Sequence, residues 1–342
     1  MSSQSSKIFI APVEKGPGAW DGFYRHLLHL ENISSEKKHQ LTDDPEAADF
    51  IILTDANDDD LFRGLRIHPL LRQYPEKTFT IYEGDFPQRF VPGIFTSMPK
   101  SIFNFKRFLP GTYSYCQSRC GNTVDLIESK QRAGDIFFSF IGRNRHFIRN
   151  RLFKLKFNRD DILIKDSSEF DYFKEKASGR NDSKLRYLDI CMRSRFMLCP
   201  RCQGTSSIRL FEAMQMGIAP VIISDKWVRP EGPDWESFAV IVKEKDIAHL
   251  PEIVGKYDAS WRERGELARQ NWEKWFQTKD EFNFIVASLA QLKARRIFSE
   301  RWCRIFWPVI LARIQIRRRF SSVKKYATVF MRRITGNVSS RK

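Results

Sequence analysis

The sequence predicts an α/β fold with parallel sheets, arranged in two domains that a basic C-terminal tail follows. Short apolar runs of strand length alternate with amphipathic segments of helix length, which is the pattern of parallel α/β proteins. The 342 residues exceed the ~100–200 residues of an ordinary single domain. Lys and Arg concentrate near the C-terminus, where residues 291–342 hold 15 of them beside a single acid, Glu300.

The first half is expected to contain strands that end in polar loops. The expected elements, in order, are a strand at 7–10, a helix at 21–30, a strand at 50–53, a helix at 61–72 and a strand at 77–82. Polar residues 54–60 and 83–87 follow two of these strands. Parallel strands bring their carboxyl ends to one edge of a sheet, where ligands of such folds bind. Residues 91–134 show no clear periodicity and are assigned to the remainder of this domain and the link to the next.

The second half repeats the alternation of strands and helices. The expected elements are strands at 135–141, 161–165, 196–199, 220–223 and 238–242, and helices at 185–193, 208–216 and 261–293. Gly142 and Arg143 end its first strand and lead into a segment rich in Arg and Lys, so a glycine corner with cations is expected there. The predicted division of the chain is 1–130, 131–296 and a tail at 297–342.

The stretch from Phe196 to Trp235 has the order strand, small-residue loop, helix, strand. Such a loop holds phosphates, because first-turn amides have no partner within their helix. Ser206 and Ser207 lie in this loop. Arg209 stands in the first helical turn, which is favourable for a cation when an anion lies between it and the helix end. Glu212, one turn on, would accept hydrogen bonds from ribose; the alternative is an Arg209–Glu212 pair on a solvated helix face.

The C-terminal tail predicts a basic amphipathic helix. From Trp302 the sequence interleaves Trp, Phe and Ile with Arg, and its apolar part is too short to span a bilayer. Aromatic and basic residues in one helix suit an anionic membrane surface; the alternative is a disordered, solvated basic tail. Outside residues 291–342 the net charge is only +3 of the total +17, which argues against a nucleic-acid-binding protein.

Several of these motifs occur together in one known family, and the chain resembles the exostosin glycosyltransferase domain. The resemblance is carried by Tyr187, Phe196–Arg201, Ser207–Ala213, Gly217–Ile222 and Asp234-Trp235, and further back by Asp44–Phe50 and Phe140–Arg143. It is strongest over residues 185–245 and weakest between 91 and 134. One departure is the loop Arg201–Thr205, where relatives often have a Gly-rich or basic loop, so donor preference is expected to differ.

The resemblance implies a fold of the GT-B type, with two Rossmann-like domains facing across a cleft. It implies a nucleotide-sugar donor held mainly by the second domain, inversion at the anomeric carbon, and neither a cofactor nor an essential metal. By motif, Arg209 would meet the diphosphate, Glu212 the ribose, and Ser206 and Ser207 the phosphates. Gly142 and Arg143 would lie at the facing edge of the cleft.

An inverting transferase also needs a base for the acceptor hydroxyl. Glu83 and Asp85 are the leading candidates, because they follow a strand at a corner shaped by Gly84 and Pro87. Asp55 and His26 are further candidates. For each of the four, the alternative is a solvated loop charge or a helix cap.

No metal site is expected. Asp58–Asp60 contains the DxD pattern that binds Mn²⁺ or Mg²⁺ in another transferase class, but acids also favour a helix start, which is expected next. Cys199 and Cys202 form a CxxC, and Cys116 and Cys120 a CxxxC. Without a second well-spaced CxxC, zinc or redox chemistry is not predicted.

The predicted function is an inverting glycosyltransferase of the hexosyl or glycuronosyl type in polysaccharide biosynthesis. It would move a sugar from a UDP-linked donor to a glycan or lipid-linked glycan. The N-terminus has neither a basic nor a long apolar segment typical of a secretory signal, so a cytoplasmic protein peripheral to the membrane is expected, in keeping with a bacterial family member. The alternatives are a non-catalytic partner of another transferase and, with less support, a nucleic-acid binder acting through the basic tail.

Overall fold

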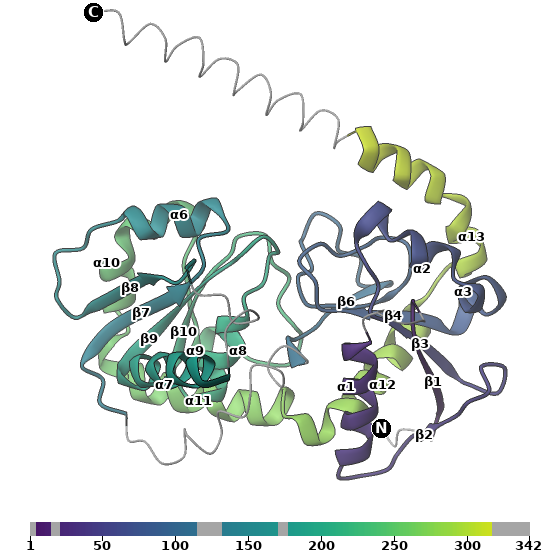
Figure 1. Cartoon of the computed structure of the whole chain (residues 1–342), viewed down its shortest axis with the longest axis horizontal. Helices are drawn as coiled ribbons and strands as arrows, with labels where there is room; N and C mark the ends of the chain where they lie inside the picture. The colour runs from purple at the N-terminus through teal and green to yellow at the C-terminus, as the bar shows by residue number, and fades with distance from the viewer. Residues whose placement is uncertain (1–4, 15–20, 115–131, 170–176, 317–342) are drawn as a thin grey trace, which may run out of the picture.

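The computed structural model describes residues 5–14, 21–114, 132–169 and 177–316. Two parallel sheets lie side by side with helices packed around them (Figure 1). All ladders within the two sheets are parallel, which confirms the predicted α/β class. In the described part of the chain, no helix is both long enough and apolar enough to cross a membrane.

The first sheet has the strand order β2-β1-β3-β4-β5-β6. Its strands are β1 (Lys7–Pro12), β2 (Gln40–Leu41), β3 (Phe50–Thr54), β4 (Thr78–Tyr82), β5 (Gly93–Phe95) and β6 (Phe108–Pro110). Every residue of β3 is buried, because layers cover both faces of a parallel sheet and the strand sequence is an unbroken apolar run ending in Thr54.

The second sheet has the order β11-β10-β9-β7-β8. Its strands are β7 (Ile136–Gly142), β8 (Ile162–Asp166), β9 (Ser194–Pro200), β10 (Ala219–Ile223) and β11 (Val240–Ile241). The central strands β9 and β10 are buried along almost their whole length. The carboxyl ends of β7, β9 and β10 meet at one edge, where the loop into the next helix begins.

Helices occupy most of the chain between the strands. They are α1 (Gly22–Ile33), α2 (Arg63–Ile67), α3 (Pro69–Gln73), α6 (Phe147–Lys154), α7 (Ala177–Arg193), α8 (Ile208–Gln215), α9 (Trp235–Phe238), α10 (Leu250–Gly255), α11 (Trp261–Trp275), α12 (Thr278–Arg295) and α13 (Glu300–Ile305). Short 3-10 helices lie at Asp59–Leu61, Pro75–Lys77, Glu244–His249 and Asp258–Ser260. Residues 307–316 are also helical.

The single helix predicted at 61–72 is wrong. Two short helices, α2 and α3, replace it, because Pro69 has no backbone N–H and restricts His68 to an extended conformation. Asp60, Leu61 and Phe62 have positive φ, so the chain turns left-handed before α2 begins.

Two strands were missed in the segment that lacked periodicity. The three-residue strands β5 and β6 extend the first sheet within 91–114. Three residues are too few to show an alternating pattern, so their pairing depends on the neighbouring strand β4 rather than on local sequence.

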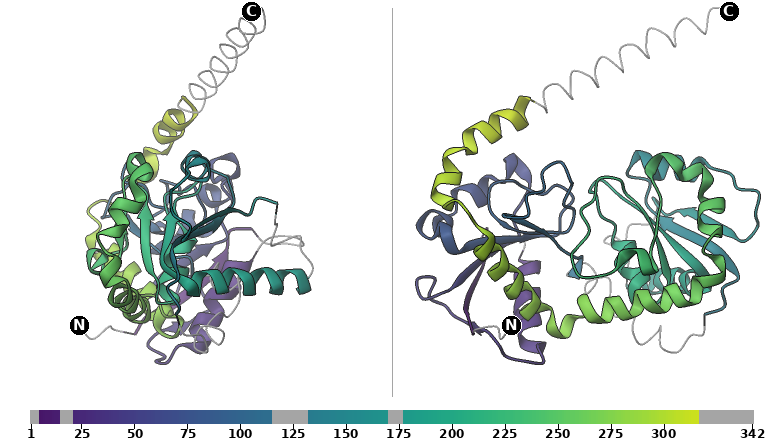
Figure 2. Two further views of the ribbon diagram at one scale, coloured as in Figure 1. Left: turned by 90° about the vertical axis from the view of Figure 1, so that its left-hand side faces the viewer. Right: turned by 180° about the vertical axis from the view of Figure 1, so that it is seen from behind.

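The long helical segment predicted at 261–293 divides into two helices that serve different halves. α11 packs against α8 and β10 of the second half, whereas α12 packs against α1 of the first half. The views in Figure 2 show these green helices passing from one half to the other. The buried side chains Phe282, Val286 and Leu289 of α12 join the core cluster of β1, β3 and β4. The domain boundaries predicted from the sequence, with the second domain at 131–296, assign this helix to the second half.

The two halves touch directly near Trp227. Pro99 of the first half and Trp227 of the second form an isolated antiparallel bridge. Trp227 Nε1 donates to the carbonyl of Thr96 at 3.1 Å, and Lys100 Nζ donates to the carbonyl of Asp225 at 2.8 Å. These contacts bring the loops after β5 and β10 together.

Candidate active site

The loop between β9 and α8 carries three consecutive buried hydroxyls. The Oγ1 of Thr205 and the Oγ atoms of Ser206 and Ser207 are inaccessible and make no hydrogen bond within the described structure. Ser207 is the N-cap residue of α8, yet its side chain does not cap the helix. Buried polar groups normally have partners, so three in a row at a helix start have the character of a binding loop.

Arg209 and Glu212 form the pair expected from their spacing. Arg209 Nη1 lies 2.9 Å from Glu212 Oε2, and its Nε donates to the carbonyl of Ile141 at 3.0 Å. Tyr187 donates its hydroxyl to the same Glu212 oxygen at 2.6 Å, and the guanidinium lies 5.0 Å from the Tyr187 ring centre. Both charged side chains are partly buried, so the pair does not stand on a fully solvated helix face.

Gly142 and Arg143 lie at the turn between β7 and α6, as the sequence predicted. β7 ends at Gly142, where an added Cβ would come within 2.7 Å of the Phe140 ring. The carbonyl of Arg143 accepts a hydrogen bond from Arg149 Nη1 at 3.3 Å. Arg149 also donates to the carbonyls of Pro200 and Arg201, so this corner lies beside the β9–α8 loop.

Arg149 is a site residue that the sequence analysis did not single out. It lies on α6, is only 7% exposed, and donates to the carbonyls of Pro200 (3.0 Å) and Arg201 (3.2 Å). Burial lowers its pKa, and the positive charge of Arg209 lowers it further. A bound anion would relieve the repulsion between the two guanidinium groups. In the sequence Arg149 is one of several cations in a basic segment, and nothing there indicates that its side chain is buried.

Arg201 begins the loop that differs from the loop of the family, and its side chain forms an ion pair. Arg201 is buried and its Nε lies 2.7 Å from Glu244 Oε1. Glu244 also accepts from the N–H of Asp225 at 3.3 Å. Glu244 begins the 3-10 helix after β11, so this carboxylate connects Arg201 in the loop after β9 with Asp225 in the loop after β10.

Asp85 joins the first half to this loop. Its Oδ1 accepts a hydrogen bond from the backbone N–H of Gly204 at 3.0 Å. Burial raises the pKa of Asp85, and the hydrogen bond from Gly204 opposes that shift. A Cβ at position 204 would lie 2.6 Å from Asp85 Oδ1 and closer still to Ser97 Oγ. Gly204 thus allows the two halves to approach at the loop that carries the hydroxyls.

The other base candidates have different surroundings. Asp55 accepts from the N–H groups of Phe23 and Tyr24, both at 2.9 Å, so it caps the start of α1 as the alternative interpretation proposed. Its pKa is raised by burial. Glu83 follows β4 and is partly buried, and its charge contributes to a raised pKa at Glu281.

His26 belongs to a buried polar chain that the sequence did not reveal. Its Nε2 lies 2.7 Å from Ser114 Oγ, and Ser114 donates to Glu281 Oε2 at 2.6 Å. Burial lowers the pKa of His26 to about 4 and raises the pKa of Glu281 to about 8. Both groups are therefore neutral near pH 7. No sequence pattern connects residues 26, 114 and 281.

The possible metal ligands do not gather in the described residues. Within that part of the chain there is no group of three His, Cys, Asp or Glu side chains placed to hold a metal ion. Asp60 lies in the left-handed turn before α2, and Cys199 is buried with its thiol donating to the carbonyl of Met197. Cys116 and Cys120 lie outside the described residues.

Two α/β halves, each built on a parallel sheet, thus meet beside a loop that carries three buried hydroxyls and has arginines next to it. Comparison with known proteins shows which family this region resembles. The Exostosin GT47 domain model matches residues 111–257, which contain the β9–α8 loop. This match confirms the resemblance seen in the sequence.

The similarity to individual proteins extends beyond the matched domain. The chain is 25% identical over 302 residues to an Exostosin-1 homolog of Caenorhabditis elegans, covering 74% of this chain and 76% of that protein. It is 21% identical over 334 residues to Exostosin-1 of Bos taurus, covering 85% of this chain but only 43% of the bovine protein. A probable glycosyltransferase of Arabidopsis thaliana is 38% identical over 72 residues, 20% of this chain and 15% of that one. The similarity to this family supports a glycosyltransferase.

Proposed function

We propose that this protein is an inverting glycosyltransferase of the GT-B type. Its donor is a UDP-linked nucleotide sugar, and it adds the sugar to a glycan or lipid-linked glycan. The observation that carries the proposal is the set of unpartnered hydroxyls of Thr205, Ser206 and Ser207 at the start of α8, among the described residues. A diphosphate has enough acceptor oxygens to satisfy all three hydroxyls.

The charges around the loop support a diphosphate rather than a neutral ligand. The charge of Arg209 lowers the pKa of the buried Arg149 beyond the effect of burial, and α8 begins at the same loop, where the positive end of a helix favours an anion. In the proposed complex Arg209 binds the diphosphate, while Glu212, already oriented by Tyr187, accepts from the ribose hydroxyls. Gly142 and Arg143 would border the donor from the β7 side.

The proposed reaction breaks the bond between the anomeric carbon and the diphosphate oxygen. The acceptor oxygen attacks the anomeric carbon from the opposite face, its proton passes to a carboxylate, and the diphosphate leaves with the bonding electrons. Charge that develops on the diphosphate would be stabilised by the helix start, the hydroxyls and the arginines, so we propose that the reaction needs no metal or cofactor.

Asp85 is the better supported of the two proposed bases. It reaches the donor loop from the opposite half, and burial raises its pKa toward the range useful for proton abstraction. Glu83, two residues earlier, is the second candidate. Separate Asp85→Asn and Glu83→Gln variants would assign the role, since loss of the base lowers turnover typically about 10²–10⁴-fold.

The test is a screen of nucleotide sugars for donor hydrolysis and transfer. The wild-type chain should consume one donor class, and the Ser206→Ala/Ser207→Ala variant should lose about 10²–10³-fold in kcat/KM, as expected when donors to a developing oxyanion are removed. Ser183→Ala on α7, in the same half, is the matched control and should keep full activity. Absence of both donor binding and turnover across the screen would favour the non-catalytic partner instead.

A further inference from the structure

Residues 297–316 present large apolar side chains on two opposite sides. On the inner side Trp307 is buried and packs edge-to-face on Phe90, with ring centres 5.5 Å apart. Ile310, Leu311 and Ile314 pack against the same core cluster of the first half. This side is therefore already covered by the protein.

The outer side is open to solvent. Phe298 is 71% exposed and Trp302 67% exposed. The exposed apolar residues of the segment are Ile297, Phe298, Trp302, Ile305, Phe306, Val309 and Ile316. Several recur every three or four residues, a spacing that places side chains on one face of a helix. A dense exposed apolar surface of this kind marks an interaction site.

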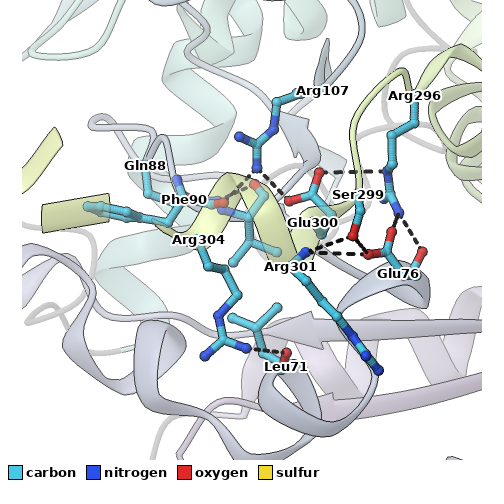
Figure 3. A network of polar contacts seen from close by, with 11 residues as sticks. Leu71, Glu76, Gln88, Phe90, Arg107, Arg296, Ser299, Glu300, Arg301 and Arg304 are labelled. Carbon is cyan, nitrogen blue, oxygen red and sulfur yellow. Dashed lines mark hydrogen bonds and ion pairs between the residues drawn. The ribbon is translucent and has the colours of Figure 1, made fainter. Parts of the chain in front are cut away.

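A polar network fixes this segment to the first half (Figure 3). Glu300 is buried and accepts from Arg107 at 2.7 Å. Arg296 and Ser299 both bond to Glu76, which precedes β4. Arg304 Nη1 donates to the carbonyl of Leu71 at 3.3 Å. With its inner side held in this way, the helix cannot turn its outer apolar side chains into the core.

Charge indicates which partner covers the outer side. Residues 291–342 hold 15 Lys and Arg and a single acid, and that acid, Glu300, is buried against Arg107. A second copy of the chain would bring two strongly basic segments together, which like-charge repulsion opposes. An anionic lipid surface attracts the same charges and also accommodates Trp and Phe at headgroup depth.

We propose that residues 297–316 form a docking surface for an anionic lipid bilayer, with the outer apolar side chains inserted among the headgroups and the neighbouring cations on lipid phosphates. Trp307 and Phe90 join this surface to the loop after β4 that carries Glu83 and Asp85. One consequence rests on the proposed transferase function: a bilayer beside this loop favours a lipid-linked acceptor over a soluble one.

The experiment measures binding of the full chain to vesicles, without any need for activity. Vesicles of phosphatidylcholine and phosphatidylglycerol in equal parts should bind the wild type, and pure phosphatidylcholine vesicles should bind it far less. The Trp302→Ser/Phe306→Ser variant should lose about tenfold or more in affinity. Ile67→Ser/Phe105→Ser, which changes two exposed apolar residues elsewhere on the first half, should bind like the wild type.

Two further measurements complete the test. Arg301→Gln/Arg313→Gln should weaken binding about fivefold per residue removed, and added salt should do the same. Donor hydrolysis should be unchanged in the Trp302→Ser/Phe306→Ser variant, which separates docking from the proposed chemistry. Equal binding of this variant and the wild type, no binding by either, or a wild-type dimer that this variant converts to monomer would overturn the proposal.

Discussion

Single residues in the β9–α8 loop carry polar groups that the described part of the fold leaves unsatisfied. A buried hydroxyl without a partner costs about 1–3 kcal/mol, and Thr205, Ser206 and Ser207 present three of them together. Proteins retain such local costs mainly where function requires the groups. The same loop has Arg149 and Arg209 as neighbours, so the residues that destabilise the ligand-free chain are those best suited to a diphosphate.

Replacement of Arg209 tests the proposed diphosphate contact. We expect Arg209→Ala to lower kcat/KM for the donor about 10²–10³-fold, because one charged donor to the leaving group is lost. The variant should still fold with a lower thermal midpoint, because Glu212 loses a partly buried partner but keeps the hydrogen bond from Tyr187. Arg193→Ala, which removes an exposed arginine paired with Asp135, should leave turnover unchanged. Wild-type turnover in Arg209→Ala would contradict the assignment.

Replacement of Gly204 tests the contact between the halves. A Cβ at this position meets Asp85 and Ser97, so Gly204→Ala should lower the free energy of unfolding by about 1–3 kcal/mol. Adding Ser97→Gly should restore part of the loss, because the closest contact disappears. Gly255→Ala is the control, since an added Cβ there meets nothing within 4 Å. Urea unfolding measures all three, and equal stability of Gly204→Ala and the wild type would show that the halves do not meet at this loop.

At the scale of elements, buried polar links hold helices to the first sheet. His26 on α1, Ser114 after β6 and Glu281 at the start of α12 form one hydrogen-bonded chain, and Asp55 at the end of β3 caps α1. These links join elements that are far apart in sequence. They also place an uncharged carboxyl inside the protein, which makes stability depend on pH.

Deprotonation of Glu281 should lower the free energy of unfolding as the pH rises. Its carboxyl has an ordinary pKa of 4.5 and a folded pKa of about 8, so unfolding releases a proton between these values and the free energy of unfolding falls as pH increases. His26, with its pKa lowered from 6.5 to about 4, acts in the opposite direction but only below its unfolded value. The window from pH 6.5 to 8 therefore isolates Glu281.

The Glu281→Gln variant tests this pH dependence. It keeps an acceptor for Ser114 and should flatten the decline in unfolding free energy between pH 6.5 and 8, so that it becomes more stable relative to the wild type as pH rises. Asp280→Asn, at an exposed position in the same helical turn, should keep the wild-type slope. If Glu281→Gln kept the wild-type slope, the carboxyl of Glu281 would not titrate between pH 6.5 and 8.

At the scale of the whole molecule, the chain crosses between its halves more than once. α12 follows the second half in sequence but completes the core of the first, and residues 297–316 cover a further face of that half. The stability of the first sheet therefore depends on residues that come last in the described chain. The same arrangement sets the proposed membrane-docking surface on the first half.

Truncation of Leu289 tests the place of α12. This side chain is fully buried, so Leu289→Ala should lower the unfolding free energy by about 2–5 kcal/mol. Hydrogen exchange should show the largest loss of protection in β1 and β3 rather than in β7 and β9, because α12 packs on the first sheet. Phe284→Ala on the same helix removes a 44% exposed side chain and should change stability by no more than about 0.5 kcal/mol. A loss of protection confined to β7 and β9 would contradict this placement.

The amino-acid sequence alone predicted the α/β class, most of the longer strands, and the loop that carries Ser206 and Ser207. These features are local, because the burial of a strand and the small residues of a loop leave a pattern within a few neighbouring positions. The ordered motifs also predicted the exostosin resemblance. Local patterns failed at 61–72, where Pro69 breaks the helix, and at the three-residue strands β5 and β6.

Which polar groups meet became clear from the packing of the elements. Arg149 looked like any cation in a basic segment, and nothing in the sequence joined Asp85 to Gly204 or His26 to Glu281. A hydrogen bond between residues separated by 88 or more positions depends on how the sheets and helices pack, while the local pattern records only that each side chain is polar. Likewise, periodicity predicted the tail helix, but packing on the first half decided which of its apolar side chains remain exposed.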